Sequence, residues 1–134
     1  MTPNEWLLDE TRRWVQRAEK DLRVAEICAA ELPAEALFHC QQAAEKYLKA
    51  YLTWHQTAFR KTHELRELAA ACALIDPALE SALVPAEALS KYAWRFRYPG
   101  APYEPDAEEA AQGRALAEQV RGEIRRRLPQ AALS

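Results

Sequence analysis

Residues 34–54 read AEALFHCQQAAEKYLKAYLTW, and this stretch decides the fold class. Its apolar side chains recur every three or four residues: Leu37, Cys40, Ala44, Leu48 and Tyr51. That spacing places them along one face of an α-helix rather than along one face of a strand. Pro33 directly precedes the stretch and ends any helix that comes before it. The pattern therefore predicts a long helix with one buried face over residues 34–54.

A similar spacing precedes this stretch. Between residues 5 and 31 the residues that share a face alternate in steps of three and four: Leu8, Thr11, Val15, Ala18, Leu22, Ala25 and Ala29. A third helix is expected after Thr62, which suits an N-cap, and Asp76–Pro77 ends it. Its inward side chains are expected to be Leu65, Leu68, Cys72 and Ile75.

Two more helices are expected beyond residue 77. A turn over residues 78–84 leads to a fourth helix, which begins near Pro85 and ends before Pro99. The last helix is expected from near Pro105 to Pro129. Its buried face consists of Ala110, Ala117, Val120, Ile124 and Leu128. Because the connections are short, the sequence predicts an all-α, antiparallel bundle of about five helices.

The composition supports a single helical domain. Ala and Leu fill 43 of the 134 positions, whereas the β-branched residues Val, Ile and Thr fill 12, which favours helices over a β-sandwich or barrel. Three glycines are too few for a glycine-rich phosphate loop, and no dinucleotide-binding fingerprint occurs. Because no repeat or linker interrupts the chain, we expect one domain over residues 1–134, with its core at about residues 10–128.

Charge, cysteine content and hydropathy argue against several further classes of protein. The net charge of −2 argues against a generally basic nucleic-acid binder. Neither the cysteines nor the histidines have the spacing of a metal site, so we expect no metal and no cofactor. The first residues lack the features of a secretory signal, and the longest apolar run, residues 68–75, is too short for a membrane span of about 20 residues. A cytoplasmic protein is expected.

The helix over residues 34–54 also carries a polar stripe. His39, Gln42, Lys46 and Lys49 follow one another at steps of three, four and three, which places them on one side of the helix. Residues 34–62 hold four basic and two acidic residues, so this part of the chain is locally basic. The stripe is therefore a candidate phosphate site. The alternative is a solvated helix face on which Glu45 pairs with Lys49.

Two further groups are basic or aromatic. Lys61 and His63 flank the expected start of the third helix, where backbone amides can hold an anion, although a plain capped helix start explains them equally. Residues 91–100 read KYAWRFRYPG, in which aromatic residues alternate with Arg95 and Arg97. Such a segment can stack on bases and bind phosphate. The alternative is that Tyr92 and Phe96 belong to the core while the arginines face solvent.

The order of these groups resembles the HEPN family, the higher eukaryotes and prokaryotes nucleotide-binding domain. The resemblance covers about residues 10–128. It is carried by Trp14 and residues 18–22 (AEKDL), residues 36–50 (ALFHCQQAAEKYLKA), residues 61–65 (KTHEL) and residues 97–99 (RYP).

The resemblance implies a five-helix bundle, usually a homodimer, that binds a nucleotide or RNA. It also implies a minimal nucleotidyltransferase as the partner protein, in a module that resembles a toxin–antitoxin pair. The residues that match the family's polar motifs, and are implied to hold phosphate, are His39, Gln42, Lys46, Lys49, Lys61, His63, Arg95 and Arg97. The tryptophans are candidates for an interface or groove wall, since aromatic residues are enriched at interfaces. They are Trp6, Trp14, Trp54 and Trp94.

Two alternatives to simple binding stay open. Some members of the family are metal-independent ribonucleases, in which an Arg is followed after four to six residues by a His. Here Arg60 is separated from His63 by two residues, and the residue six after Arg97 is Tyr103. If the chain were such an enzyme, the candidates would be His39, His63 and Arg97, with a histidine moving the 2′-hydroxyl proton and the arginine stabilising the phosphorane. The other alternative is a purely structural dimer module.

Overall fold

The computed structural model describes residues 1–134 and contains five α-helices, two 3₁₀ helices and no strand. The α-helices are α1 (Pro3–Cys28), α2 (Pro33–Trp54), α3 (Leu65–Ile75), α4 (Leu79–Leu83) and α5 (Ala107–Arg125). The 3₁₀ helices are η1 (Val84–Ala93) and η2 (Gln130–Ala132). The expected all-α bundle of about five helices is confirmed.

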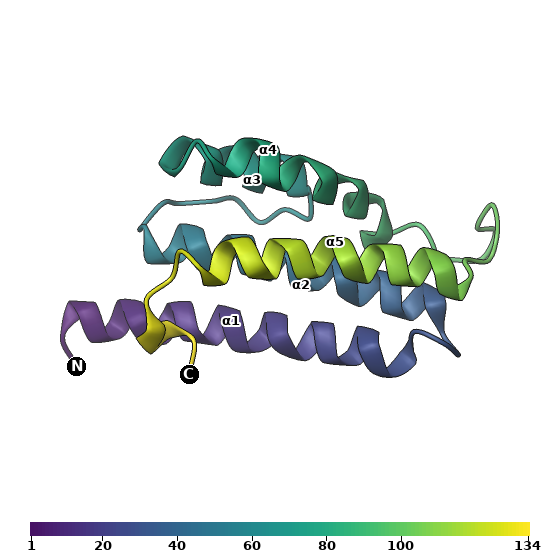
Figure 1. The fold of residues 1–134 in the computed structure, drawn as a ribbon, viewed down its shortest axis with the longest axis horizontal. Coiled ribbons are helices and arrows are strands. Elements are labelled where there is room, and N and C mark those ends of the chain that lie inside the picture. The colour runs from purple at the N-terminus through teal and green to yellow at the C-terminus, as the bar shows by residue number, and fades with distance from the viewer.

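The helices form a bundle around α2, which packs against α1, α3, α5 and η1. Figure 1 shows α1, α2 and α5 lying side by side; α3 and η1 pack on the remaining side of α2, and α4 packs on α3, α5 and η1 rather than on α2. The two chain ends lie at one end of the bundle, and the α1–α2 turn and the loop over residues 94–106 lie at the other. None of these helices combines the length and the apolarity that crossing a membrane requires.

Local sequence sets the ends of the long helices. Thr2 caps α1: its side chain accepts a hydrogen bond from the Glu5 amide, while the Glu5 carboxylate accepts one from the Thr2 amide. Pro3 and Pro33 occupy the first helical turns, where a missing N–H costs nothing. Asp106 caps α5 by accepting from the Glu109 amide at 2.8 Å.

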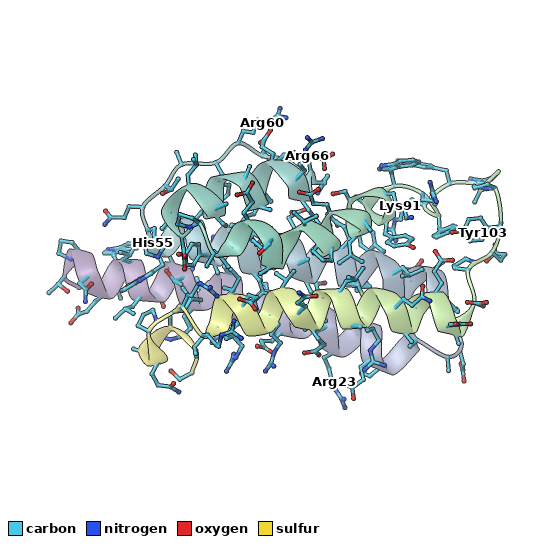
Figure 2. All side chains as sticks on the ribbon, turned by 45° about the horizontal axis from the view of Figure 1, so that its top comes forward. Arg23, His55, Arg60, Arg66, Lys91 and Tyr103 are labelled. Atoms are coloured by element: carbon cyan, nitrogen blue, oxygen red, sulfur yellow. The ribbon has the colours of Figure 1, made fainter.

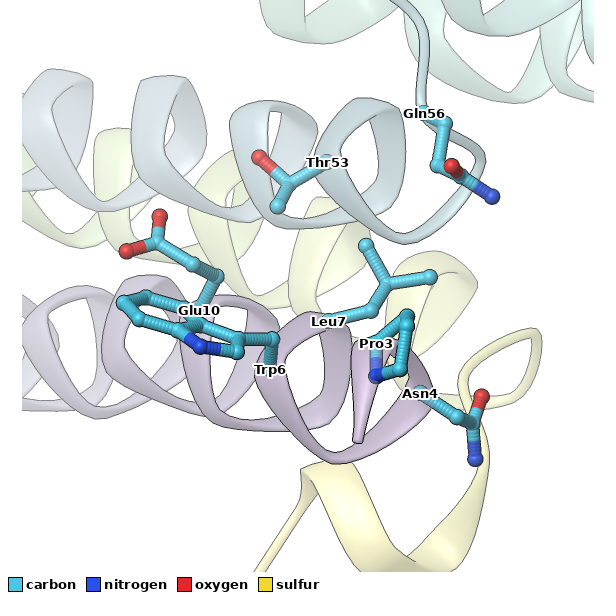
Figure 3. Close-up of a pocket in the computed structure, with 7 residues that line it drawn as sticks. All are labelled: Pro3, Asn4, Trp6, Leu7, Glu10, Thr53 and Gln56. Carbon is cyan, nitrogen blue, oxygen red and sulfur yellow. The ribbon is translucent and has the colours of Figure 1, made fainter. Parts of the chain in front are cut away.

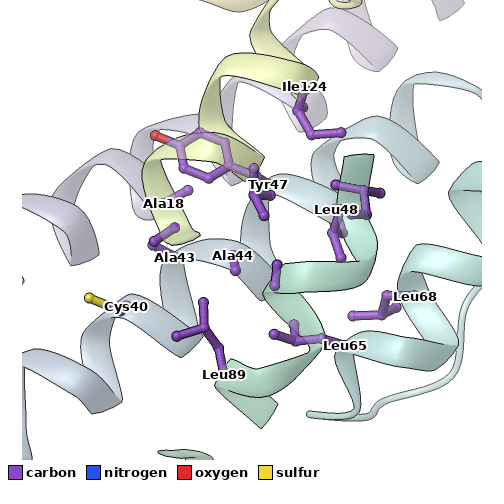
Figure 4. Close-up of a cluster of buried hydrophobic side chains, with 14 of the residues drawn as sticks. Ala18, Cys40, Ala43, Ala44, Tyr47, Leu48, Leu65, Leu68, Leu89 and Ile124 are labelled. Atoms are coloured by element: carbon purple, nitrogen blue, oxygen red, sulfur yellow. The ribbon is translucent and has the colours of Figure 1, made fainter. Parts of the chain in front are cut away.

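The apolar stripes read from the sequence form the core. Every expected inward residue of α2 and α5 is buried, and in α1 only the terminal members, Leu8 and Ala29, are partly exposed. Figure 4 shows Tyr47 and Leu48 of α2 between Ile124 of α5 and the leucines of α3. Because α2 is covered on most sides, its remaining solvent-facing edge is narrow; His39, Gln42 and Lys46 of the polar stripe lie there, whereas Lys49 is buried.

Three local expectations were wrong. The third helix begins at Leu65 rather than after Thr62, because Glu64 occupies the cap position and Thr62 instead accepts a hydrogen bond from the Glu64 amide. The segment expected as a turn, residues 78–84, contains α4. The fourth helix is of 3₁₀ type, in keeping with Pro85, which has no N–H to continue the α-helical hydrogen bonds of α4.

The tryptophans divide into two kinds. Trp6 and Trp94 are 57% and 59% exposed, as side chains at an interface or groove wall would be in the isolated chain. Trp14 and Trp54 instead pack against the core.

Candidate functional site

The first cluster on the polar stripe forms around Asp21 of α1, which is 8% exposed. Nδ1 of His39 lies 2.8 Å from one carboxylate oxygen, and Nζ of Lys46 donates to the other at 2.5 Å. Two members of the predicted stripe are therefore fixed to one buried carboxylate on the neighbouring helix. Because the Asp21 carboxylate accepts a hydrogen bond from Nδ1–H, Nε2 of a neutral His39 carries the free lone pair.

The second cluster forms around Glu45 of α2, whose side chain is 5% exposed. Nζ of Lys49 donates to one oxygen at 2.9 Å, and Nδ1 of His63 lies 2.8 Å from the other. Gln41 donates both to Glu45 and to the backbone carbonyl of His63. The structure thus joins the stripe to the predicted group at residues 61–65 through a single carboxylate.

Aromatic rings cover the Lys49 ammonium. Trp14 and Phe59 form an edge-on pair, and Nζ of Lys49 lies 5.6 Å and 5.7 Å from the centres of their rings. Phe59 belongs to residues 55–64, the α2–α3 connection, which we call the strap. The strap therefore lies over the Glu45–Lys49 pair and shields it from solvent.

The environment of Glu45 keeps its side chain charged. Burial by itself raises the pKa of the Glu45 carboxyl, but the hydrogen bonds from His63, Lys49 and Gln41 outweigh burial and leave the pKa below its ordinary value. Glu45 is therefore a permanent anion at neutral pH, and it holds Lys49 and the strap in place.

Arg97 reaches the same side of α2 from the loop over residues 94–106. Its guanidinium lies 3.9 Å from the centre of the Phe38 ring and pairs with Glu35 at 3.3 Å. The Phe38 ring in turn contacts the His39 ring, edge-on at 5.2 Å. Arg97 is therefore next to the His39 cluster rather than the His63 cluster, which lies about two helical turns further along α2.

The remaining predicted residues make fewer contacts with the rest of the protein. Lys61 is exposed and has no ion-pair partner, and Gln42 donates to the Gln41 side chain at 2.7 Å. Arg95 lies 5.8 Å from the ring centre of the exposed Trp94. Figure 2 shows Lys91 and Tyr103 at one end of the molecule and His55, the third histidine, at the other.

Tyr103 is held as a hydrogen-bond donor. Its hydroxyl donates to Glu109 at 2.8 Å, and this bond raises the pKa of the phenol. At neutral pH the residue in the position of the missing histidine is therefore even less available as a phenolate, and so even less able to accept a proton, than an ordinary tyrosine.

The surface hollows of the protein lie away from these clusters. The hollow in Figure 3, about 340 Å³, is bounded by the start of α1 and the end of α2 and is lined by Trp6, Glu10 and Thr53 among others. None of the five hollows is lined by a residue of the predicted phosphate site. No group of three or more His, Cys, Asp or Glu side chains is arranged to hold a metal ion. The site thus lies in no hollow: it is a polar edge of α2 at which His39, Lys46 and His63 reach solvent, whereas Lys49 is buried.

Sequence reasoning missed the two organising anions. Asp21 is on a different helix, and nothing in its own neighbourhood marks it as a partner of His39. Glu45 was identified only as a possible surface partner of Lys49. The α1 pattern indicates only that Asp21 lies at a helix contact, since it is adjacent to the buried Leu22 on the edge of the apolar stripe. It does not identify His39 as the partner.

Comparison with known proteins gives one match. The model of the HEPN domain matches residues 11–127, which is most of the chain. No curated protein and no solved structure matches. The match spans α1 to α5 and includes Asp21, Glu45 and every predicted site residue. The chain therefore belongs to the HEPN domain family.

Proposed function

We propose that this chain binds RNA or a nucleotide through phosphate groups along the exposed edge of α2. The residues proposed for the site are His39, Gln42, Lys46, Lys49, Lys61, His63, Arg95 and Arg97; Lys49, whose side chain is only 7% exposed, supports the site by holding Glu45 rather than by reaching the phosphate. Membership of the HEPN family supports a nucleotide- or RNA-related function. The observation that carries the proposal is the placement of two cation–carboxylate clusters, around Asp21 and Glu45, one after the other on the same side of α2.

The arrangement suits an anion that contacts several groups weakly. With neutral histidines, each carboxylate balances the charge of the one lysine beside it, so the clusters fix the directions of the polar groups rather than raise the local potential. Lys61 adds an unpaired charge, and the histidines can donate hydrogen bonds to phosphate oxygens. Binding is therefore expected to be moderate in strength and to weaken steeply with salt.

The test is a titration of a labelled single-stranded RNA and of mononucleotides at several salt concentrations. Lys46→Ala and Lys61→Ala should each weaken binding, and Lys61→Ala should lower the salt slope by about 0.7 if it removes one phosphate contact. Arg23→Ala is the matched control, because Arg23 is exposed on α1 and belongs to neither cluster. Absence of binding by the wild-type chain, or equal losses in all three variants, would contradict the proposal.

The partner proposal follows from the family resemblance. We propose that the chain is a cytoplasmic homodimer and works with a minimal nucleotidyltransferase in a toxin–antitoxin-like module. The test is to co-express the chain with a nucleotidyltransferase encoded beside it and to purify one protein through a tag on the other. Recovery of both at fixed stoichiometry supports the pairing, and recovery of the tagged protein alone counts against it.

One observation favours a second candidate, a metal-independent ribonuclease. Asp21 orients His39 so that the unprotonated Nε2 can take a proton, and Arg97 is close by through Phe38. In such a reaction His39 accepts the proton of the RNA 2′-hydroxyl, the 2′-oxygen forms a bond to the adjacent phosphorus, and the P–O5′ bond breaks to leave a 2′,3′-cyclic phosphate. The departing 5′-oxygen takes a proton back from the protonated His39 or from water, and Arg97 stabilises the negative charge of the phosphorane. Cleavage that persists with chelator and is lost in His39→Ala, but not in His55→Ala, would establish this activity.

A further inference from the structure

The outer side of α1 carries three cations that lie outside the predicted phosphate site. They are Arg13, Arg17 and Lys20, which follow one another at steps of four and three and therefore share one side of the helix. All three are exposed. Arg13 pairs with Asp9 at 3.0 Å, whereas Arg17 and Lys20 take part in no ion pair within the chain. Two positive charges on α1 are thus left without a counter-charge.

These three cations and Gln16 line a hollow of about 240 Å³. Of the five hollows on the surface, it is the one whose lining contains no Asp or Glu. A smaller hollow of about 110 Å³ shares two of the cations and is lined also by Trp14 and Glu10. Because Glu10 repels anions at that end, an anion is favoured at the end formed by Arg17 and Lys20.

The α1 hollow lies beside the edge of α2 that is proposed to bind phosphate. Nζ of Lys49, in one cluster of that edge, lies 5.6 Å from the centre of the Trp14 ring, and Asp21 is the centre of the other cluster. Arg17 comes three residues after Trp14 and four before Asp21, so it lies on the same side of α1 as both. Arg17 is therefore between the two clusters, and Lys20 is next to Asp21 in the chain.

The α1 cations supply an attraction that the clusters themselves lack. Each cluster pairs one lysine with one carboxylate, so with neutral histidines neither carries a net charge. Phosphate binding depends on uncompensated positive charge, since release of counterions from the phosphates supplies most of the non-specific binding free energy. Lys61 provides one such charge on the strap, and Arg17 and Lys20 add two on α1.

We propose that Arg13, Arg17 and Lys20 form a second phosphate site, the α1 subsite, across which a strand bound at α2 continues. The three positions span about 10 Å of the helix axis, which is too long for one phosphate group and suits successive phosphates of a strand. Arg17 can hold two oxygens of one phosphate, and Lys20 acts as a mobile point charge. The inference rests on the proposed function and adds the class of ligand, a single-stranded polynucleotide rather than a mononucleotide.

The test compares a labelled single-stranded RNA with a mononucleotide at several salt concentrations. The wild-type chain should bind the RNA about tenfold or more tightly than the mononucleotide, because only the strand reaches α1 and α2 together. The double variant Arg17→Gln/Lys20→Gln should narrow this difference and lower the salt slope for RNA by about 1.4, at about 0.7 for each lost phosphate contact. Arg17→Lys keeps the charge and should keep the slope.

Arg23→Gln/Arg66→Gln is the matched control. It removes the same charge from two exposed arginines, on α1 and α3, that belong to neither proposed site. Circular dichroism verifies that all variants fold. An equal change of slope in the control and in Arg17→Gln/Lys20→Gln, or no change in either, overturns the α1 subsite.

The same titrations separate this inference from the proposed function. If Lys46→Ala and Lys61→Ala weaken RNA binding and Arg17→Gln/Lys20→Gln does not, the α1 subsite alone is rejected. If the α1 variant weakens binding and the two lysine variants do not, the α1 subsite stands and the site on α2 is rejected. A wild-type chain that binds neither the RNA nor the mononucleotide overturns both.

Discussion

Nζ of Lys49 lies 2.9 Å from Oε2 of Glu45, and the two side chains are only 7% and 5% exposed. A buried pair adds little net stability, because desolvation offsets the attraction, but breaking it from one side leaves an uncompensated charge in the interior. Lys49 is therefore part of the framework of the site, and the rings of Trp14 and Phe59 keep its ammonium from direct contact with a phosphate. A loss of binding in a Lys49 variant would not by itself identify a ligand contact.

Lys49→Met is expected to lower the free energy of unfolding by about 3–5 kcal/mol, because it leaves the Glu45 carboxylate buried without its lysine. Urea denaturation measures the change. Adding Glu45→Gln should recover part of the loss, since the uncompensated charge is then removed. Lys46→Met is the comparison variant and should cost less, because the Lys46 and Asp21 side chains are 20% and 11% exposed and water can partly solvate the carboxylate that is left. If both lysine variants lower the free energy of unfolding equally, the deeper burial of the Glu45–Lys49 pair does not raise the cost of removing its lysine.

The protein is expected to lose stability in acid, in part through three carboxyl groups. Hydrogen bonds from Arg127 lower the pKa of Asp76, and those from Arg126 and Arg127 lower the pKa of Glu123. The pKa of Glu45 is lowered too, by bonds that outweigh its burial. A carboxyl whose folded-state pKa lies below its unfolded value stabilises the fold above the unfolded value and loses this contribution as the pH falls through the folded value.

The free energy of unfolding should therefore decrease as the pH falls below about 4.5, the ordinary value for Glu. Urea denaturation at a series of pH values between neutrality and pH 3 measures it. Glu123→Gln should flatten this dependence, because its carboxyl no longer takes up a proton on unfolding. An unchanged pH dependence in that variant would mean that Glu123 titrates alike in the folded and unfolded chain.

The sequence predicted the packing of the long helices better than the surroundings of the polar side chains. The stripes of α2 and α5 could be read because apolar spacing reports a single helix and its buried side. The partners of His39 and His63 could not, because Asp21 and Glu45 meet them only once separate segments are packed together. The prediction of an α-helix after Pro85 was wrong for a similar reason. The segment after Leu83 packs on α3 and α5 as a 3₁₀ helix. Over a segment this short, apolar spacing does not distinguish a 3₁₀ helix from an α-helix.

Glu109 is expected to anchor the loop over residues 94–106. The hydroxyls of Tyr92 and Tyr103 both donate to its Oε2, at 2.5 Å and 2.8 Å. Burial raises the pKa of Tyr92, with a further contribution from Glu109, and the bond to Glu109 raises that of Tyr103. Glu109→Gln removes the negative charge, so both phenol pKa values should fall toward the ordinary value for tyrosine.

Ultraviolet titration of the phenols follows this change, and limited proteolysis should cut the loop faster in Glu109→Gln. Loss of the charged acceptor should lower the free energy of unfolding by about 1.5–3 kcal/mol. Glu108→Gln is the matched control, because Glu108 is exposed on the same helical turn and makes no such bond. A tyrosine titration that is unchanged in Glu109→Gln would contradict the anchoring role.

The two glycines of α5 are expected to respond in opposite ways to replacement by alanine. A Cβ at Gly113 would lie 2.5 Å from Cδ2 of Leu37, and in ordinary van der Waals contact with Leu89 and Cys40. Leu37 is fully buried, so it can move only by disturbing the contact between α2 and α5. Overpacking of this kind costs about 1–3 kcal/mol, which exceeds the gain of about 1 kcal/mol in helix propensity.

A Cβ at Gly122 would meet no atom within 4 Å, so Gly122→Ala should keep the propensity gain and raise the free energy of unfolding by up to about 1 kcal/mol. Thermal and urea unfolding of the two variants test the prediction directly, since each serves as the control for the other. Stabilisation by both alanines would show that Leu37 yields without cost and that α5 approaches α2 less tightly than the structure indicates. Destabilisation by both would mean that α5 disfavours alanine for a reason other than contact with α2.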